Sequence, residues 1–180
     1  MSYGKILRVD LSSGKTRTEE VDQSLARQHI GGRGYASRLL HEELPAKTDP
    51  LGPENILIFA TGPLTGTSAP TGGRYMVVTK GPLNGYIASS NSGGVWGAEL
   101  AKAGYFMVIL TGKARNPSYL WIKDETVELR DASKIWGLDT HAATDALIDA
   151  VGESSAKVSC IGPAGERMSK IACIINDKHR

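Results

Sequence analysis

A loop rich in glycine and threonine is the first part of the sequence that could bind a ligand. It reads TGPLTGTSAPTGGRY, from Thr61 to Tyr75, and its one charged side chain is Arg74. Backbone N–H groups of glycine-rich segments can converge on an anion, and an arginine offers phosphate a planar fork of donors. A long loop whose threonines bond to their own backbone would have the same composition, and composition alone favours it. The loop by itself leaves both interpretations open.

A second polar segment comes directly before a predicted helix. Asn91, Ser92, Gly93 and Gly94 stand at the start of the pattern GGVWGAELAKAGY, which we expect to be helical over 93–105. The first N–H groups of a helix have no partners within the helix, so they bind phosphate readily. The same residues could simply cap the helix, with Asn91 or Ser92 as the N-cap. Beside the loop that carries Arg74, they favour an anion-binding site.

The third polar segment is the last one, NDKHR. Asn176, Asp177, His179 and Arg180 follow a predicted apolar strand, and the sequence stops there, which we interpret as a cut within a loop. Paired carboxylates, a nucleophile elbow and an HExxH motif are missing from the 180 residues, and the histidines lack metal-ligand spacing. We therefore expect an anion-binding platform without a catalytic residue of its own.

Composition and charge exclude several classes of protein. Lys and Arg number 21, Asp and Glu number 19, and the two signs are interspersed. A nucleic-acid-binding protein needs a clustered basic face, so we expect no nucleic acid partner. No apolar run approaches the ~18 residues of a membrane span, and the first residues lack the apolar core of a signal peptide. We expect a cytoplasmic protein in which Cys160 and Cys173 are reduced and mostly buried.

Turn residues and hydrophobic periodicity predict a mixture of hairpins and helices, and therefore an α+β fold. Hairpins are expected over 4–21, 74–90 and 118–130, and single apolar strands over 56–62, 106–112, 157–162 and 170–176. Helices are expected over 21–32, 35–44, 93–105 and 139–152, the first capped by Asp22 and terminated by Gly31. A helix leads to an apolar strand with a glycine turn three times, which suggests an internal duplication.

Taken in this order, the segments resemble the N-terminal domain of the aldehyde ferredoxin oxidoreductase family, the tungsten-pterin enzymes. The resemblance runs from Gly4 to Arg180, so we interpret residues 1–180 as this one domain, truncated at its C-terminal end. It implies an α+β fold in which two β-sheets with interspersed helices form the base of a pterin cofactor site. The stretches that carry it are GKILRVDLSSG, GGRG, DPLGPENILIFATGPLTGTSAPTGGRY, NSGGVWGAELAKAGY, IKDETVELRDASKIWG, IGPAGE and INDKHR.

The resemblance also implies a cofactor. Family members hold tungsten, sometimes molybdenum, through the dithiolene sulfurs of two pterins, and a magnesium ion bridges the two pterin phosphates. Arg74 would lie between the pterin and a [4Fe–4S] cluster whose ligands come from outside this segment. The Asn91 backbone carbonyl would bind the magnesium, a cation that prefers oxygen. Ser92, Gly93 and Gly94 would offer N–H groups to the phosphates, and Arg180 would belong to a second phosphate loop.

The function implied is that of the tungstopterin-binding part of an oxidoreductase. Such an enzyme oxidises aldehydes to carboxylic acids, passes the electrons to ferredoxin or another low-potential carrier, and works as a homodimer or with electron-transfer subunits. The 180 residues alone would be inactive. Two alternatives stay open: a stand-alone cofactor-binding or accessory protein without redox activity, and a family member that acts on an aromatic thioester or a hydroxy acid.

Overall fold

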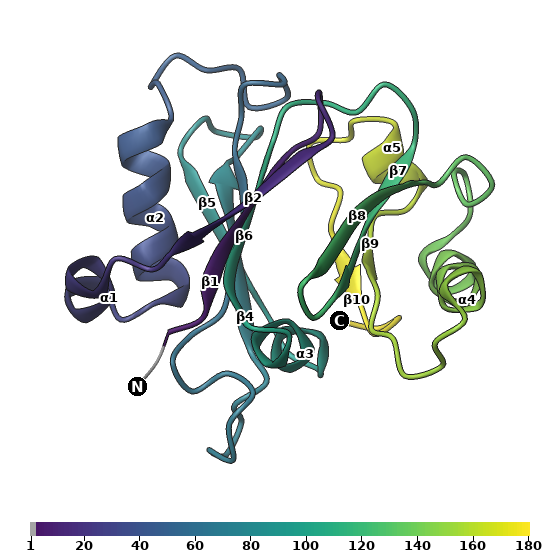
Figure 1. The fold of residues 1–180 in the computed structure, drawn as a ribbon. Helices are drawn as coiled ribbons and strands as arrows, with labels where there is room; N and C mark the ends of the chain where they lie inside the picture. The colour runs from purple at the N-terminus through teal and green to yellow at the C-terminus, as the bar shows by residue number, and fades with distance from the viewer. Residues whose placement is uncertain (1–2) are drawn as a thin grey trace.

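A six-stranded β-sheet organises the first part of the chain in the computed structural model, which describes residues 3–180 (Figure 1). β6 pairs in parallel with β1 and antiparallel with β3, and the other neighbouring strands are antiparallel. The hairpins predicted over 4–21 and 74–90 and the strands predicted over 56–62 and 106–112 are confirmed. In sheet order the strands are β2 (Lys15–Glu20), β1 (Lys5–Asp10), β6 (Tyr105–Thr111), β3 (Leu57–Ala60), β4 (Tyr75–Lys80) and β5 (Ile87–Ser92).

Two helices, α1 (Gln23–His29) and α2 (Gly32–Glu43), cover one face of this sheet (Figure 1). The predicted cap of α1 is confirmed, because the Asp22 carboxylate accepts the N–H groups of the second and third helical residues. The predicted end at Gly31 is wrong. Ile30 caps the C-terminus of α1 at φ +66°, and Gly31, at φ +144°, is the N-cap of α2. Only glycine fits there, since a Cβ on Gly31 would lie 2.9 Å from the Phe106 ring.

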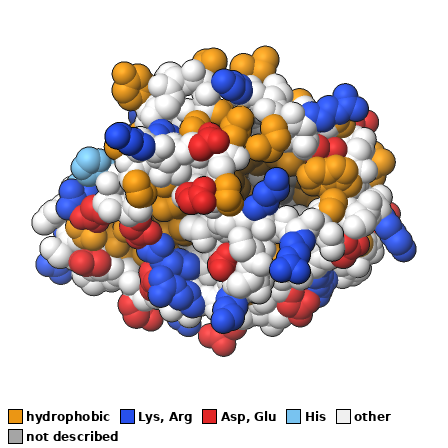
Figure 2. All heavy atoms as spheres, turned by 90° about the horizontal axis from the view of Figure 1, so that it is seen from above, with side chains coloured by type: hydrophobic (Ala, Val, Ile, Leu, Met, Phe, Trp, Pro, Cys, Tyr) orange, Lys and Arg blue, Asp and Glu red, His pale blue; other side chains and the backbone are white. Residues whose placement is uncertain are grey.

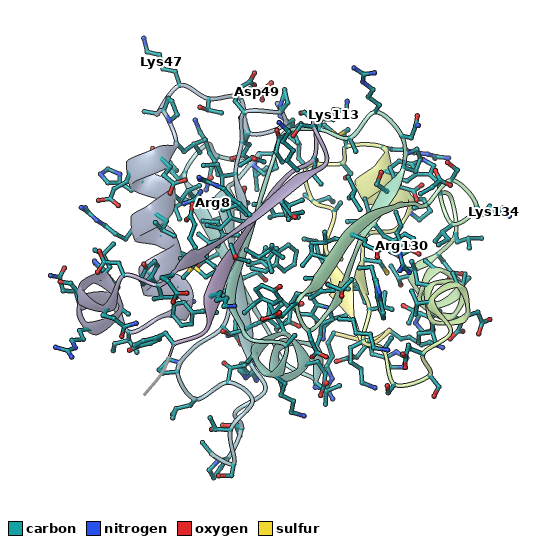
Figure 3. The ribbon with its side chains drawn as sticks, in the orientation of Figure 1. Arg8, Lys47, Asp49, Lys113, Arg130 and Lys134 are labelled. Carbon is teal, nitrogen blue, oxygen red and sulfur yellow. The ribbon has the colours of Figure 1, made fainter. Side chains whose placement is uncertain are left out.

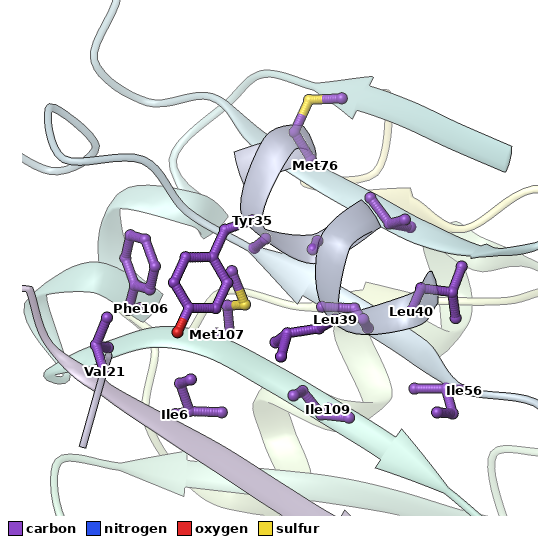
Figure 4. Close-up of a cluster of buried hydrophobic side chains, with 14 of the residues drawn as sticks. Ile6, Val21, Tyr35, Leu39, Leu40, Ile56, Met76, Phe106, Met107 and Ile109 are labelled. Carbon is purple, nitrogen blue, oxygen red and sulfur yellow. The ribbon is translucent and has the colours of Figure 1, made fainter. Parts of the chain in front are cut away.

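The main hydrophobic core lies between α2 and the sheet (Figure 4). Tyr35 packs edge-on against Phe106, with ring centroids 5.7 Å apart, and both side chains are buried. Alternation along β1 places Ile6 in this core, whereas Leu7 and Val9 join a second core on the opposite face of the sheet. The period-two pattern read from the sequence therefore reflects a strand that is buried on both faces.

The second face of the sheet packs against α3 (Trp96–Lys102) and a second layer (Figure 1). This layer contains two two-stranded sheets, so the expected pair of sheets is in fact one large sheet and two small ones. The predicted hairpin over 118–130 and helix over 139–152 are confirmed. The elements of the layer are β7 (Ser118–Lys123), β8 (Thr126–Asp131), α4 (Thr140–Val151), β9 (Ser159–Cys160), α5 (Pro163–Glu166) and β10 (Ile175–Asn176).

The last two strands are much shorter than predicted. β9 and β10 pair with each other through only two residues each, and 170–174 lie outside any strand of the described chain. The apolar run there includes Ile171, which is 83% exposed. Apolar residues make a strand only where a neighbouring strand supplies hydrogen bonds, and the sequence pattern cannot reveal that neighbour.

The order of elements recurs along the chain. A hairpin, helical structure and an antiparallel strand pair occur first as β1–β2, α1–α2 and β3–β4, and again as β7–β8, α4 and β9–β10. This order fits the internal duplication that the sequence suggested, which stays a prediction.

Several expectations drawn from composition concern the surface. Basic and acidic side chains are interspersed on the face seen from above (Figure 2). Both cysteines are free thiols, as expected, but Cys160 is half-buried and Cys173 is exposed, so the expectation of mostly buried thiols is wrong for Cys173. Within residues 3–180, no helix is both long and apolar enough to cross a membrane.

Arg8 ties the β1–β2 hairpin to α2 (Figure 3). Its guanidinium donates to both carboxylate oxygens of Glu43, at 2.7 and 2.5 Å, and to Glu19 at 2.8 Å. The Arg8 side chain is only 18% exposed. The hydrogen bonds that Arg8 donates to Glu43, followed by the one to Glu19, raise the pKa of Arg8 above its usual value. The charge of Arg8 is therefore fixed at any ordinary pH.

We expect Arg8→Ala to lower the free energy of unfolding by about 2 kcal/mol, because it leaves the partly buried Glu43 carboxylate without its cation and leaves Glu19 paired only with the exposed Arg17. Urea denaturation of both proteins measures the difference. Lys5→Ala is the control, since Lys5 pairs with Glu125 at 3.6 Å on an exposed surface. Its effect should stay below about 0.5 kcal/mol. Equal losses in the two variants would contradict the assigned role of Arg8.

Asp139 caps the N-terminus of α4 and makes its stability depend on pH. The Asp139 carboxylate accepts the N–H of Ala142 at 2.8 Å and of His141 at 2.9 Å, and these bonds lower the pKa of Asp139 below 3.8. A carboxyl whose pKa falls on folding stabilises the protein above its unfolded pKa, and this is lost as pH falls through the folded pKa. Asp139→Ala should therefore melt below the wild type at pH 7, and the gap should close in acid below that pKa. A difference in melting temperature that stays constant from pH 7 down to this acidic pH would contradict the prediction.

Candidate anion-binding site

The first two predicted segments lie side by side because their strands are neighbours. β4 and β5 pair in the register Tyr75–Ser92 and Met76–Asn91. Arg74 immediately precedes β4, and its Nη1 donates to Asn91 Oδ1 at 2.5 Å. Both side chains are exposed. The structure thus brings Arg74 and Asn91 together at one end of the sheet, as the sequence predicted.

The C-terminal segment joins them at the same place. Asn176 donates through Nδ2 to the Gly93 carbonyl at 2.9 Å and accepts the Ser92 hydroxyl at 2.6 Å. Asp177 accepts the backbone N–H of Val95 at 2.9 Å. Residues 176–180 therefore lie directly against residues 92–95, and three segments far apart in the sequence form one surface.

Glycines allow these loops to approach so closely. Gly94 has φ +87°, and a Cβ there would lie 2.1 Å from Asp177 Oδ2 and 3.0 Å from Arg180 Cδ. A Cβ on Gly73 would lie 2.4 Å from the Gly94 carbonyl oxygen. A Cβ on Gly93 would stand 3.7 Å from Arg180 Nη1, which is ordinary contact distance. Gly94 thus makes room for the C-terminal segment, and Gly73 makes room for Gly94.

The predicted helix start at this segment is wrong. Asn91 and Ser92 belong to β5, and α3 begins only at Trp96, with Val95 as a cap that lacks a side-chain hydrogen bond. The reason is tertiary, because pairing with β4 continues as far as Ser92. Asn91 and Ser92 are therefore neither N-cap residues nor the N-terminus of a helix, and any anion would meet them as the end of a strand.

The glycine-threonine loop also differs from the converging nest of N–H groups that was one interpretation. The Gly66 N–H bonds to the Gly72 carbonyl at 2.7 Å, the Gly62 N–H bonds to Thr65 Oγ1 at 2.9 Å, and the Thr67 hydroxyl bonds to Leu64 at 2.8 Å. The self-bonded interpretation therefore holds for the body of the loop. Of the residues predicted to bind ligand in this loop, Arg74 is the one that reaches the site.

The charges at the site favour an anion. Arg74 and Arg180 are both exposed and cationic, whereas the Asp177 carboxylate is half-buried and engaged by Val95 and Asn176. The Lys178 ammonium group pairs with Asp145 on α4 at 2.6 Å. Two exposed guanidinium groups beside the glycine backbone can bind phosphate groups.

Sequence reasoning missed one residue of the site. Tyr75 is 2% exposed, and its hydroxyl donates to Asn176 Oδ1 at 3.0 Å. Burial raises the pKa of Tyr75, so the hydroxyl stays protonated and able to donate. The neighbouring Arg74 marks this segment as a candidate, but no pattern in the sequence indicates the hydrogen bond between Tyr75 and Asn176, which lie 101 positions apart.

Comparison with known proteins gives a consistent result. Residues 6–180 match the family model described as the N-terminal domain of aldehyde ferredoxin oxidoreductase. The chain is 52% identical over 178 residues to a tungsten-containing aldehyde ferredoxin oxidoreductase of Pyrococcus abyssi (strain GE5 / Orsay), covering 99% of this chain and 29% of that protein. It is 36% identical over 187 residues to an aliphatic sulfonate oxidoreductase, WOR-like subunit, of Pyrococcus furiosus (strain ATCC 43587 / DSM 3638 / JCM 8422 / Vc1), covering 96% of this chain and 30% of that protein.

A solved structure shares the fold. The chain matches the active site complex BamBC of benzoyl coenzyme A reductase, solved with 1,5 dienoyl-CoA, at a TM-score of 0.95 and 36% identity. The match covers 98% of this chain and 27% of that chain. The chain spans about 30% of the length of the curated relatives it matches.

Proposed function

The chain belongs to the aldehyde ferredoxin oxidoreductase family, and from this we propose that it is the tungstopterin-binding N-terminal domain of a longer enzyme that oxidises aldehydes to carboxylic acids. In this reaction one oxygen from water enters the product, and two protons and two electrons leave. The electrons pass to ferredoxin or another low-potential carrier. The proposed domain comprises residues 1–180.

One observation carries the proposal: Arg74, Asn91–Gly94 and Arg180 meet on one exposed surface although they come from three separate segments. Two arginines beside a glycine backbone suit a ligand with more than one phosphate group. The donor set of the site therefore fits a pair of pterin phosphates.

Each residue then has a defined task. Arg180 and the backbone of Ser92, Gly93 and Gly94 would hold the phosphates, and the Asn91 carbonyl would offer oxygen to a magnesium ion there. Arg74 would hold the pterin and would face a [4Fe–4S] cluster whose ligands come from outside residues 1–180. When bound, the tungsten or molybdenum centre supplies the two-electron redox chemistry. We propose no general acid or base within this domain.

A similar protein of another substrate class gives the second candidate function. The matching solved structure is that of a benzoyl coenzyme A reductase complex, so an aromatic thioester is the alternative substrate. Identity of 52% to the aldehyde oxidoreductase, against 36% to that structure, favours the aldehyde.

Two free thiols support a cytoplasmic location, where thiols stay reduced. A homodimer or a complex with electron-transfer subunits is the proposed assembly.

Metal and activity measurements on the full-length protein test the proposal. After anaerobic purification we expect tungsten or molybdenum, pterin and magnesium in fixed ratio to the protein, and ferredoxin-linked oxidation of an aldehyde panel. Reaction with an aromatic thioester but with no aldehyde would favour the second candidate. Protein without metal or pterin, from cells supplied with tungstate and molybdate, would favour an accessory protein and overturn the proposal.

A further inference from the structure

We propose that Asn176 is the positioning residue of this site, and that it fixes Arg180 and the Ser92–Gly93 backbone relative to each other. The proposal deepens the proposed function and rests on it. Asn176 lies at the end of β10 and is 0% exposed. Buried polar side chains are expensive unless they are hydrogen-bonded, so a buried asparagine beside a binding surface calls for a reason.

The Asn176 side chain uses its full hydrogen-bonding capacity. A carboxamide offers two acceptor positions and two N–H donors. Its Oδ1 accepts the Tyr75 hydroxyl at 3.0 Å and the Ser92 hydroxyl at 2.6 Å. Its Nδ2 donates to the Gly93 carbonyl at 2.9 Å and to Asp177 Oδ2 at 3.0 Å. One side chain therefore holds the start of β4, the end of β5 and the C-terminal loop together.

The Asn176 backbone holds the other part of the site. Its N–H donates to the Arg180 carbonyl at 2.6 Å, and its carbonyl accepts the Arg180 N–H at 3.0 Å. These bonds close a tight loop in which Asp177 and Lys178 have positive φ, at 49° and 64°. Asn176 thus orients Arg180 through its backbone and Ser92–Gly93 through its side chain, so it couples the two groups that would face the phosphates.

No other side chain of similar size can replace it. Aspartate keeps the acceptors but loses both donors, and it would place a second carboxylate against Asp177. Leucine has a similar volume but would leave the buried Tyr75 hydroxyl and the partly buried groups of Ser92 and Gly93 without their bonds to Asn176. The requirement is for donors and acceptors in one planar group.

Asn55 provides a matched control at the other end of β4. It too is an asparagine with a full set of bonds: Nδ2 donates to Pro50, Thr79 and Lys80 at 2.8, 3.1 and 3.1 Å, and Oδ1 accepts the Ile56 N–H at 2.9 Å. Asn55→Ala therefore removes a comparable set of bonds without touching the candidate site.

The test compares Asn176→Ala, Asn176→Asp and Asn55→Ala in the full-length protein. Amide hydrogen exchange should speed up by about tenfold to a hundredfold in residues 91–95 and 177–180 of the Asn176 variants, because buried partners lose their bonds. Asn55→Ala should leave these segments unchanged. Pterin and tungsten per folded chain should fall by about tenfold or more in the Asn176 variants, as expected for the loss of ~1.4 kcal/mol of binding free energy or more. Asn55→Ala should keep its full cofactor content.

The outcomes separate this inference from the proposed function. Unchanged exchange in the two segments overturns the role of Asn176, whatever the cofactor content. If the wild type contains no pterin, the proposed function fails, and the exchange measurement still decides whether Asn176 positions the loops. Should both Asn176 variants fail to fold, Ser92→Ala removes a single bond to Oδ1 and should give smaller changes in the same direction. No change in Ser92→Ala would also contradict the inference.

Discussion

Replacing Gly94 with alanine is expected to abolish cofactor binding and to lower the free energy of unfolding by about 2–4 kcal/mol. Two effects add up. The residue has φ +87°, where an L side chain is strained, and its Cβ would lie 2.1 Å from Asp177 Oδ2 and 3.0 Å from Asn176 Nδ2. The Asp177 side chain must shift and give up the Val95 N–H, and we expect the loop at 176–180, which carries Arg180, to move away with it. Chemical denaturation and pterin content of the full-length variant measure the two effects.

Gly137→Ala separates backbone strain from the clash. Gly137 has φ +91°, but nothing lies within 4 Å of the Cβ that would be added. Gly137→Ala should therefore lower the free energy of unfolding only by the cost of backbone strain, about 1–2 kcal/mol, and the variant should keep its cofactor. If Gly94→Ala kept its pterin, or cost no more stability than Gly137→Ala, the close approach of the three loops would not be needed for binding.

Replacing Arg74 with alanine is expected to cause a large loss of function as well, but with little loss of stability. The side chain is exposed, and its one described hydrogen bond goes to Asn91. Stability should therefore change by less than about 1 kcal/mol. Losing a charge-assisted bond to the bound cofactor should lower cofactor affinity or electron-transfer rate by about 10–100-fold. Tungsten and pterin content, thermal melting and ferredoxin-linked turnover measure these quantities.

Two further variants identify what Arg74 contributes. Arg74→Lys keeps the charge but loses the planar fork, so it should restore part of the function at most. Arg38→Ala removes an exposed arginine that pairs with Glu42 on α2, and it should leave cofactor content unchanged. Full ferredoxin-linked turnover and normal metal content in Arg74→Ala would remove Arg74 from the site.

Much of the fold could be predicted because its signals are local. The β1–β2 and β7–β8 hairpins follow from alternation and turn residues within about twenty residues. The Asp22 cap follows from a side chain that reaches N–H groups two and three residues ahead. The predictions failed where a distant strand decides the outcome: β5 runs on to Ser92 because β4 pairs with it, and 170–174 form no strand because none lies beside them.

The candidate site shows the same division. By its residue types, the sequence identified the three polar segments, named Arg74, Asn91–Gly94 and Arg180, and carried the family resemblance that the comparisons bear out. It could not decide whether the glycine-threonine loop binds an anion or bonds to itself, because both need the same composition. The direction of the backbone N–H groups decides between the two, and the bond from Gly66 to Gly72 shows that the loop bonds to itself.

The tertiary structure alone decided how the site is assembled. Tyr75 and Ser92 meet Asn176 across 101 and 84 positions of sequence, because the order of strands in the sheet and the path of the second layer bring their ends together. Residue types and short-range spacing carry chemistry and local structure, so the sequence could indicate the groups that we propose to bind the ligand. The contact that holds those groups in place depends on chain topology, which no local pattern contains.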